Sequence, residues 1–108
     1  MKVGDYSPWG KIDSVTTPFR GIHIVSTSGH GGIKLSNVWN NQTPEVFRNK
    51  NGWYEEDCEA YIPMYFFPGY FSLYYEKGMY EMKQISEDGL KRWFPTEWNK
   101  YVENNKEV

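Results

Sequence analysis

Apolar β-branched residues are interspersed with polar ones in two segments near the N-terminus, residues 11–17 and 21–27. In the second segment, Ile22 and Ile24 would share one face of a strand, because side chains alternate between the two faces of a sheet. The residues between the segments, 18–21, read Pro-Phe-Arg-Gly and supply the proline and glycine of a turn. This pattern predicts an antiparallel hairpin.

Helical spacing appears further along the chain, where apolar and aromatic side chains recur every three or four positions. The residues that share this period are Tyr54, Cys58, Tyr61 and Tyr65. They predict a helix over about 53–61, and Pro63 leaves open whether it continues, kinked, to 67. Two shorter helical segments are expected before it, one turn over 37–42 and a short helix that Thr43 caps.

The C-terminal half contains two aromatic segments of high β-propensity, residues 71–75 and 79–85, with Glu-Lys-Gly between them. They predict a second hairpin. Ser86 is a candidate cap for a following helix. A last helix is expected to begin at Pro95. The apolar residues expected to face inward from these two helices are Leu90, Trp93, Phe94, Trp98 and Tyr101.

These elements together predict an α+β fold. We expect one small domain over residues 1–108, with two short antiparallel hairpins and three to four short helices. Residues 4–11 are expected to form an aperiodic N-terminal loop, and residues 34–36 a short extended segment. A chain of 108 residues can bury a core without needing a metal or a disulfide to fold.

Composition narrows the function classes. Aromatic residues make up 19% of the chain, more than a core of this size normally uses, and such residues are enriched at binding hot spots. The net charge is −2 and no basic run occurs, which disfavours direct nucleic-acid binding and suits a partner with a basic surface. A single cysteine fits a reducing compartment. No apolar run approaches the ~20 residues that span a bilayer, and no signal peptide is recognisable, so we expect a soluble, cytoplasmic protein.

Candidate chemistry is concentrated in two stretches, the acidic residues 55–59 and the glycine-rich loop 28–32. Cysteine, histidine and carboxylate side chains are the ligands that zinc prefers. If the two stretches meet, His30, Asp57 and Cys58 would supply three zinc ligands, and the candidates for a fourth are Glu56 and His23. Adjacent Asp and Cys side chains would point about 100° apart on a helix, which counts against both binding one ion.

Three other interpretations of the same residues stay open. Cys58 could act as a nucleophile with His30 as its base, although the surrounding acids would raise the thiol pKa. The carboxylates of residues 55–57 could act as a general acid and base. In the simplest case, Cys58 is a small buried residue and the acids are a solvated first helical turn. No catalytic residue is assigned.

Several motifs resemble an uncharacterised domain family of phages, plasmids and other mobile elements. The resemblance spans most of the chain, and the family has no assigned reaction. The residues that carry it are Gly21-Ile22, the segment Val25–Ser36 with its His-Gly-Gly and Leu-Ser, Gly52–Glu59 (Gly-Trp-Tyr-Glu-Glu-Asp-Cys-Glu), Tyr6–Gly10 and Leu90–Pro95.

The resemblance implies a context of conflict between phage and host. Small acidic proteins from phages resemble inhibitors of host defence, including anti-CRISPR proteins that bind a Cas effector. We therefore expect a phage-type anti-defence inhibitor, an anti-CRISPR protein with a structural zinc site, whose partner is a host effector such as a Cas nuclease. The alternative is a small metal- or cysteine-dependent enzyme acting on a nucleotide-like small molecule. We favour binding over catalysis.

Overall fold

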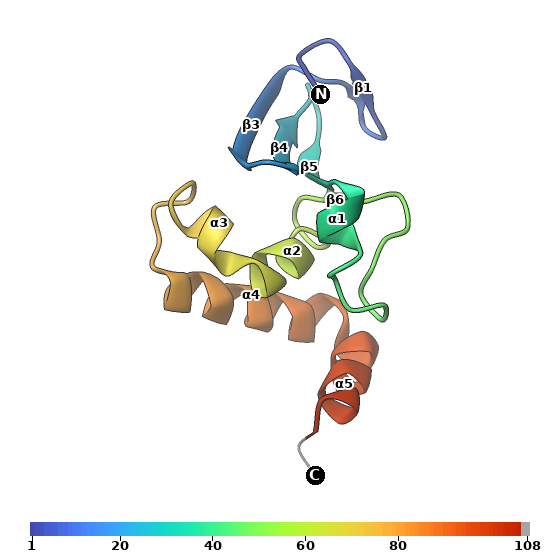
Figure 1. The fold of residues 1–108 in the computed structure, drawn as a ribbon, viewed down its shortest axis with the longest axis vertical. Coiled ribbons are helices and arrows are strands. Elements are labelled where there is room, and N and C mark those ends of the chain that lie inside the picture. The colour runs from blue at the N-terminus through green and yellow to red at the C-terminus, as the bar shows by residue number, and fades with distance from the viewer. Residues whose placement is uncertain (107–108) are drawn as a thin grey trace.

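The computed structural model describes residues 1–106, which form six strands and five helices (Figure 1). The strands are β1 (Tyr6–Ser7), β2 (Gly10–Lys11), β3 (Ser14–Phe19), β4 (Ile22–Ser26), β5 (Gly31–Leu35) and β6 (Trp53–Glu55). The helices are α1 (Asn37–Asn40), α2 (Tyr61–Phe66), α3 (Pro68–Ser72), α4 (Met79–Trp93) and α5 (Pro95–Asn104). The predicted fold class, a small α+β domain, is confirmed.

The central sheet is antiparallel and has the order β3-β4-β5-β6. The predicted N-terminal hairpin is confirmed as β3 and β4, which pair through Val15 and Val25 and turn at Gly21 with a φ of 84°. Left-handed backbone of this kind favours glycine. The N-terminal loop predicted over residues 4–11 instead contains a small two-stranded hairpin, β1 and β2.

The core lies between this sheet and the helices. Figure 1 shows α2 and α3 lying between the sheet and the long helix α4, with α5 extending away toward the C-terminus. Ile22 and Ile33 from the sheet, Phe71 from α3 and Leu90 from α4 are all buried in one cluster. Burial of this apolar surface is the main force that joins the two layers.

The helix predicted over 53–61 is wrong. Residues 53–55 form β6 instead, where Tyr54 pairs with Ile33 and its side chain is completely buried. A turn follows, with Asp57 at a φ of 75°, and the helix begins only at Tyr61. Pro63 explains the boundary, because proline lacks the N–H that an α-helix needs beyond its first turn.

The predicted second hairpin is also wrong. Residues 71–75 and 79–85 belong to the end of α3, a turn, and the first half of α4. The expected helix start at Ser86 therefore lies seven residues too late. The residues of α4 that are buried follow a helical period that the exposed tyrosines around them obscured, and they are Met82, Ser86, Gly89 and Leu90.

Three smaller predictions have mixed outcomes. The single helical turn after residue 36 and the last helix from Pro95 are confirmed as α1 and α5. Residues 43–49 form turns instead of the helix that Thr43 was expected to cap. Within residues 1–106, no helix has the length and apolar character needed to cross a membrane.

Candidate functional site

The two chemically rich stretches lie next to each other in the structure. Gly32 of β5 pairs with Glu55 of β6, and the backbone N–H of Glu56 donates to the carbonyl of Gly31 at 2.9 Å. His30 Nδ1 lies 3.6 Å from Glu55 Oε1. Backbone pairing of β5 with β6 therefore positions the histidine beside the acidic turn.

The side chains of this turn do not assemble into a ligand set. His30, Glu56 and Asp57 are exposed, and Cys58 is half-buried. In the part of the chain that the structure describes, no group of three or more His, Cys, Asp or Glu side chains is placed to hold a metal ion. These zinc ligands were predicted on the assumption that the segment is helical. The chain forms a strand and a turn there instead. Zinc binding stays a prediction, which metal analysis of the purified protein would test.

His23, the other candidate for a fourth ligand, lies elsewhere on the sheet. Its Nδ1 atom is 2.8 Å from the hydroxyl of Thr17 on the neighbouring strand. It pairs with Lys34 across β4 and β5. Partial burial lowers the pKa of His23, and the positive charges of the N-terminus and Lys34 lower it further. His23 is therefore a strand residue that resists protonation.

The surroundings of Cys58 disfavour a reactive thiolate. Burial raises the pKa of the thiol above its ordinary value, and the carboxylates of Glu59, Glu55 and Asp57 raise it further. A hydrogen bond from the Glu59 backbone acts in the opposite direction but does not reverse the shift. The nucleophile of a cysteine-dependent enzyme needs a thiol whose pKa is lowered, so that the reactive thiolate is populated.

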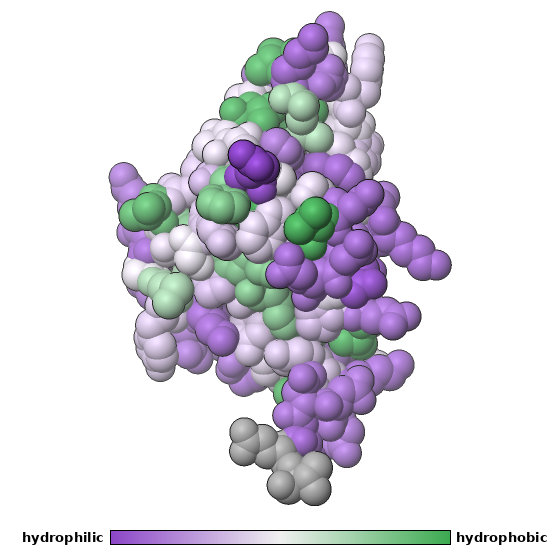
Figure 2. Space-filling model, viewed as in Figure 1, coloured by the Kyte–Doolittle hydropathy of each residue, from purple (hydrophilic) through white to green (hydrophobic). Residues whose placement is uncertain are grey.

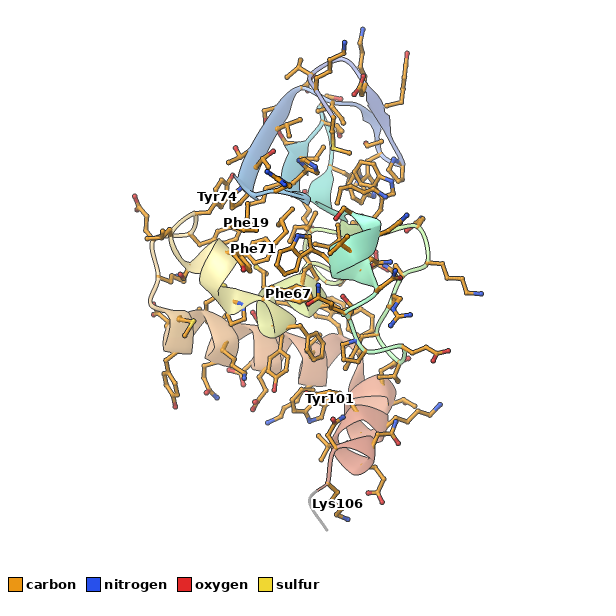
Figure 3. All side chains as sticks on the ribbon, in the orientation of Figure 1. Phe19, Phe67, Phe71, Tyr74, Tyr101 and Lys106 are labelled. Carbon is orange, nitrogen blue, oxygen red and sulfur yellow. The ribbon has the colours of Figure 1, made fainter. Side chains whose placement is uncertain are left out.

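An apolar candidate surface lies at the junction of β3, α1 and α3. We call it the apolar face, and its residues are Pro18, Phe19, Val38, Trp39, Tyr70, Leu73 and Tyr74. Figure 3 places Phe19 and Tyr74 close together where the sheet meets α3. In Figure 2, pale and green residues predominate across this middle part of the molecule, with purple residues around them.

Two hollows lie on the apolar face, and the Phe19 ring lines one of them. One, of about 370 Å³, is lined by Pro18, Tyr70 and Leu73, and the other, of about 470 Å³, is lined by Val38 and Trp39. Phe19 packs on Tyr70 with ring centroids 4.8 Å apart and contacts Trp39 edge-on at 5.8 Å. The indole N–H of Trp39 donates to the carbonyl of Arg20 at 2.7 Å, which fixes the turn that follows Phe19.

Sequence patterns alone missed this surface. Phe19 is the last residue of β3 but falls within the segment 18–21 that was interpreted as a turn, and Leu73 and Tyr74 were interpreted as strand residues of the second hairpin. The signal that could have identified them is a large apolar residue within turn punctuation, as in Pro18-Phe19-Arg20-Gly21. Such residues have no core to face in a hairpin turn, so their exposure needs a separate explanation.

The sequence model of a protein family described as "Domain of unknown function (DUF7007)" matches residues 2–107. The chain belongs to this family. The match spans nearly the whole chain, and it confirms the resemblance to an uncharacterised domain family. No curated protein and no solved structure matches the chain significantly.

Proposed function

We propose that this protein is a phage-type anti-defence inhibitor that binds a protein partner, a Cas effector, through the apolar face. The observation that carries the proposal is the exposure of large apolar side chains on one continuous surface. Leu73 is 88% exposed, Val38 69% and Phe19 48%. Contiguous apolar surface that a soluble domain leaves in water is typical of a protein-interaction site.

The arrangement of this face suits tight binding. Burying one leucine-sized side chain is worth about 1.5–3 kcal/mol, and binding energy in interfaces is concentrated in a few well-packed anchors. The Phe19 ring is held by Tyr70 and Trp39 before any partner arrives. Because its position is already fixed, little side-chain entropy would be lost on binding. The two hollows of the apolar face would receive side chains of the partner.

An acidic edge next to the apolar face supports a partner with a basic surface. Tyr74 also lines a hollow of about 240 Å³ together with Glu56 and Tyr75. Glu56 and Asp57 form no ion pair with any other residue in 1–106. Unpaired carboxylates beside an apolar anchor steer association toward positive charge. A nucleic-acid-binding effector presents such charge, and an inhibitor bound there would obstruct its substrate.

Co-elution of the purified protein with guide-loaded Cas effectors, together with their target-DNA cleavage, tests the proposal. We expect a stable complex with at least one effector and loss of its cleavage activity. Leu73→Glu should weaken the complex at least about tenfold, since it places a charge within the apolar face. Leu73 is almost fully exposed, so this variant should fold normally.

Val102→Glu on α5 is the matched control, because Val102 is an exposed apolar residue outside the apolar face, 45% accessible. It should bind as the wild type does. Absence of a complex with every effector tested, alone or guide-loaded, would refute the Cas-effector assignment. A complex that Leu73→Glu leaves intact would refute the role of the apolar face.

A further inference from the structure

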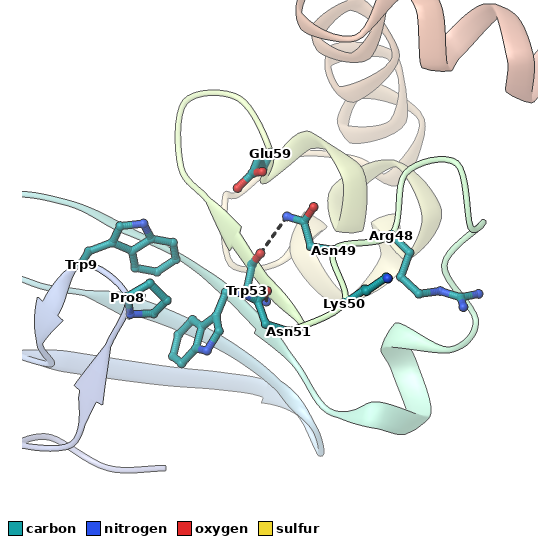
Figure 4. A pocket seen from close by; sticks show the side chains of 8 residues that line it. All are labelled: Pro8, Trp9, Arg48, Asn49, Lys50, Asn51, Trp53 and Glu59. Carbon is teal, nitrogen blue, oxygen red and sulfur yellow. Dashed lines mark hydrogen bonds between the residues drawn. The ribbon is translucent and has the colours of Figure 1, made fainter.

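A second concave surface lies away from the apolar face, where the β1–β2 turn meets the loop before β6. It is a hollow of about 440 Å³, within the size range of small-molecule sites. Figure 4 shows Trp9 and Pro8 on one side of it and Asn49 and Glu59 on the other, with Arg48 and Lys50 beyond Asn49. We call this hollow the tryptophan pocket.

The walls of the tryptophan pocket are fixed by close contacts. The indole rings of Trp9 and Trp53 meet edge to face, with centroids 5.5 Å apart. Trp9 lies directly on Gly32, where a Cβ atom would come within 2.5 Å of its ring. Because only glycine leaves room for the ring, the backbone of β5 sets the position of this wall.

Hydrogen bonds fix the opposite wall. The side-chain amide of Asn49 donates to the carbonyl of Trp53 at 2.9 Å, and the backbone N–H of Asn49 donates to the buried Tyr54 hydroxyl at 3.1 Å. The side-chain oxygen of Asn51 accepts from the N–H of Trp53 at 3.0 Å. A site held in this way is organised before a ligand binds, which lowers the entropic cost of binding.

Several polar groups in the pocket have capacity for a ligand. Of the indole N–H groups, only that of Trp39 donates to another residue in 1–106, which leaves those of Trp9 and Trp53 available. Glu59 accepts the backbone N–H of Glu55 with Oε1 at 3.0 Å, so its second oxygen can accept from a ligand. The side-chain oxygen of Asn49 is a further acceptor, because its amide nitrogen makes the bond to Trp53.

Charge is distributed unevenly along the pocket. Arg48 and Lys50 lie at the end away from Trp9, and neither forms an ion pair with another described residue. The Arg48 guanidinium donates to the carbonyls of Thr43 and Asn41, which orients it but leaves its charge uncompensated. Lys34 does not line the pocket, but its ammonium group lies 5.3 Å from the centre of the Trp53 ring, which does. The single carboxylate of Glu59 balances only one of these charges.

We propose that the tryptophan pocket binds a nucleoside monophosphate. The base would pack on the indole of Trp9, as bases do on aromatic side chains, and its N–H edge would donate to Glu59 and Asn49. The phosphate would lie at the cationic end, near Lys50 and Arg48. An organic cation is disfavoured by the positive charges of Arg48 and Lys50, and an uncharged apolar ligand would leave the cations and amides unused.

The test follows the five indole N–H signals of the 108-residue protein by proton–nitrogen NMR during titration with the four ribonucleoside 5′-monophosphates. Trp9→Phe and Trp53→Phe variants assign the two pocket signals. We expect these two signals to shift saturably with at least one nucleotide, while the other three stay in place. No saturable shift at millimolar concentration of any nucleotide would overturn the proposal.

Three further ligands identify what the pocket recognises. The matching nucleoside without phosphate should bind at least about tenfold more weakly, because it cannot use the cationic end. Inorganic phosphate alone should not move the indole signals, and shifts equal to those of the nucleotide would reduce the site to a simple anion site. Binding of a tetranucleotide more than about tenfold tighter would overturn the assignment to a free nucleotide in favour of single-stranded nucleic acid.

Lys50→Glu tests the charge argument at a residue that is exposed and forms no ion pair with another residue in 1–106. We expect it to weaken nucleotide binding at least about tenfold. Lys100→Glu is the matched control, with the same charge change at an exposed position of α5. Equal affinity in the two variants would overturn the placement of the phosphate.

Discussion

The apolar face and the tryptophan pocket are both built from aromatic side chains, yet different forces hold them. On the apolar face, Phe19 rests on Tyr70 and Trp39, and ring packing provides most of the support. Around the pocket, side-chain and backbone hydrogen bonds fix Trp53 and the preceding loop. One surface is supported by the core beneath it, and the other by a polar network at the edge of the sheet.

This difference indicates two kinds of ligand. An apolar surface gains affinity in proportion to the area it buries, so it suits a large partner. A pocket with fixed donors, acceptors and charges gains affinity from a few directed contacts, so it suits a small polar ligand. The two surfaces share no lining residue, so they can be perturbed separately.

The largest effect is expected from Phe71→Ala, which removes the buried ring of α3 beneath the apolar face. Phe71 is 0% exposed, and deleting a buried phenylalanine costs about 3–5 kcal/mol through lost contacts and the cavity left behind. Urea unfolding followed by tryptophan fluorescence measures the loss. The neighbouring Leu73→Ala should stay within about 0.5 kcal/mol of the wild type, because Leu73 is almost fully exposed. Similar losses in both variants would show that the face is not supported as described.

A smaller loss is expected from Tyr54→Phe, which acts on the pocket. The Tyr54 hydroxyl donates to Asn40 Oδ1 at 2.6 Å and accepts the N–H of Asn49. Leaving these buried groups without a partner should cost about 1–3 kcal/mol. The same variant should weaken nucleotide binding and leave partner binding unchanged, which isothermal titration calorimetry can compare. Tyr80→Phe, at a residue 83% exposed, should alter neither quantity.

Added salt should weaken nucleotide binding in the tryptophan pocket a few-fold more than partner binding on the apolar face. Raising the ionic strength from about 0.1 M to about 1 M shortens the Debye length from about 10 Å to about 3 Å and screens exposed charges. Nucleotide binding should therefore weaken several-fold, since Lys50 is exposed. Partner binding should weaken less, because the apolar contacts of Phe19 and Leu73 supply most of its affinity, while Glu56 and Asp57 act mainly on the rate of association. Equal salt dependence of the two affinities, measured in the same buffers, would contradict the comparison.

The smallest effect concerns pH and lies on the pocket side of the sheet. The pKa of His23 is lowered from its ordinary value of 6.5, so the unfolded chain binds a proton that the folded chain resists. Stability should therefore fall as the pH drops through 6.5, and it should be fully present above that value. His23→Gln should flatten this part of the profile in urea unfolding at pH 7.5 and 5.5. An unchanged slope would show that His23 is not the group responsible.

Part of the fold was predictable because its signals are local. The β3–β4 hairpin follows from β-branched residues around Pro18 and Gly21, and α5 follows from Pro95 with Trp98 and Tyr101 at helical spacing. The segments at 53–61 and 71–85 were assigned wrongly because both contain tyrosines, which satisfy strand and helix patterns equally well. Whether such a segment forms a strand or a helix is decided by the residues that it packs against in the folded chain.

The candidate sites, too, were predictable only in part. The adjacency of His30 and the acidic turn was predictable, since both stretches flank glycines that allow close approach. The positions of their side chains were not, because they depend on the left-handed turn at Asp57. The apolar face and the tryptophan pocket each join residues more than thirty positions apart, and no local pattern reports such a contact.

The sequence by itself determined the α+β class, the first hairpin, the last helix and the membership of an uncharacterised family, because each depends on short-range patterns or on motifs read directly. Tertiary structure decided that Tyr54 lies in a strand, that residues 79–85 are helical, and which aromatic rings are exposed. These outcomes depend on which segments bury one another's apolar surface. Burial is a property of the whole chain, and for that reason the surfaces proposed to bind ligands became visible only in the folded protein.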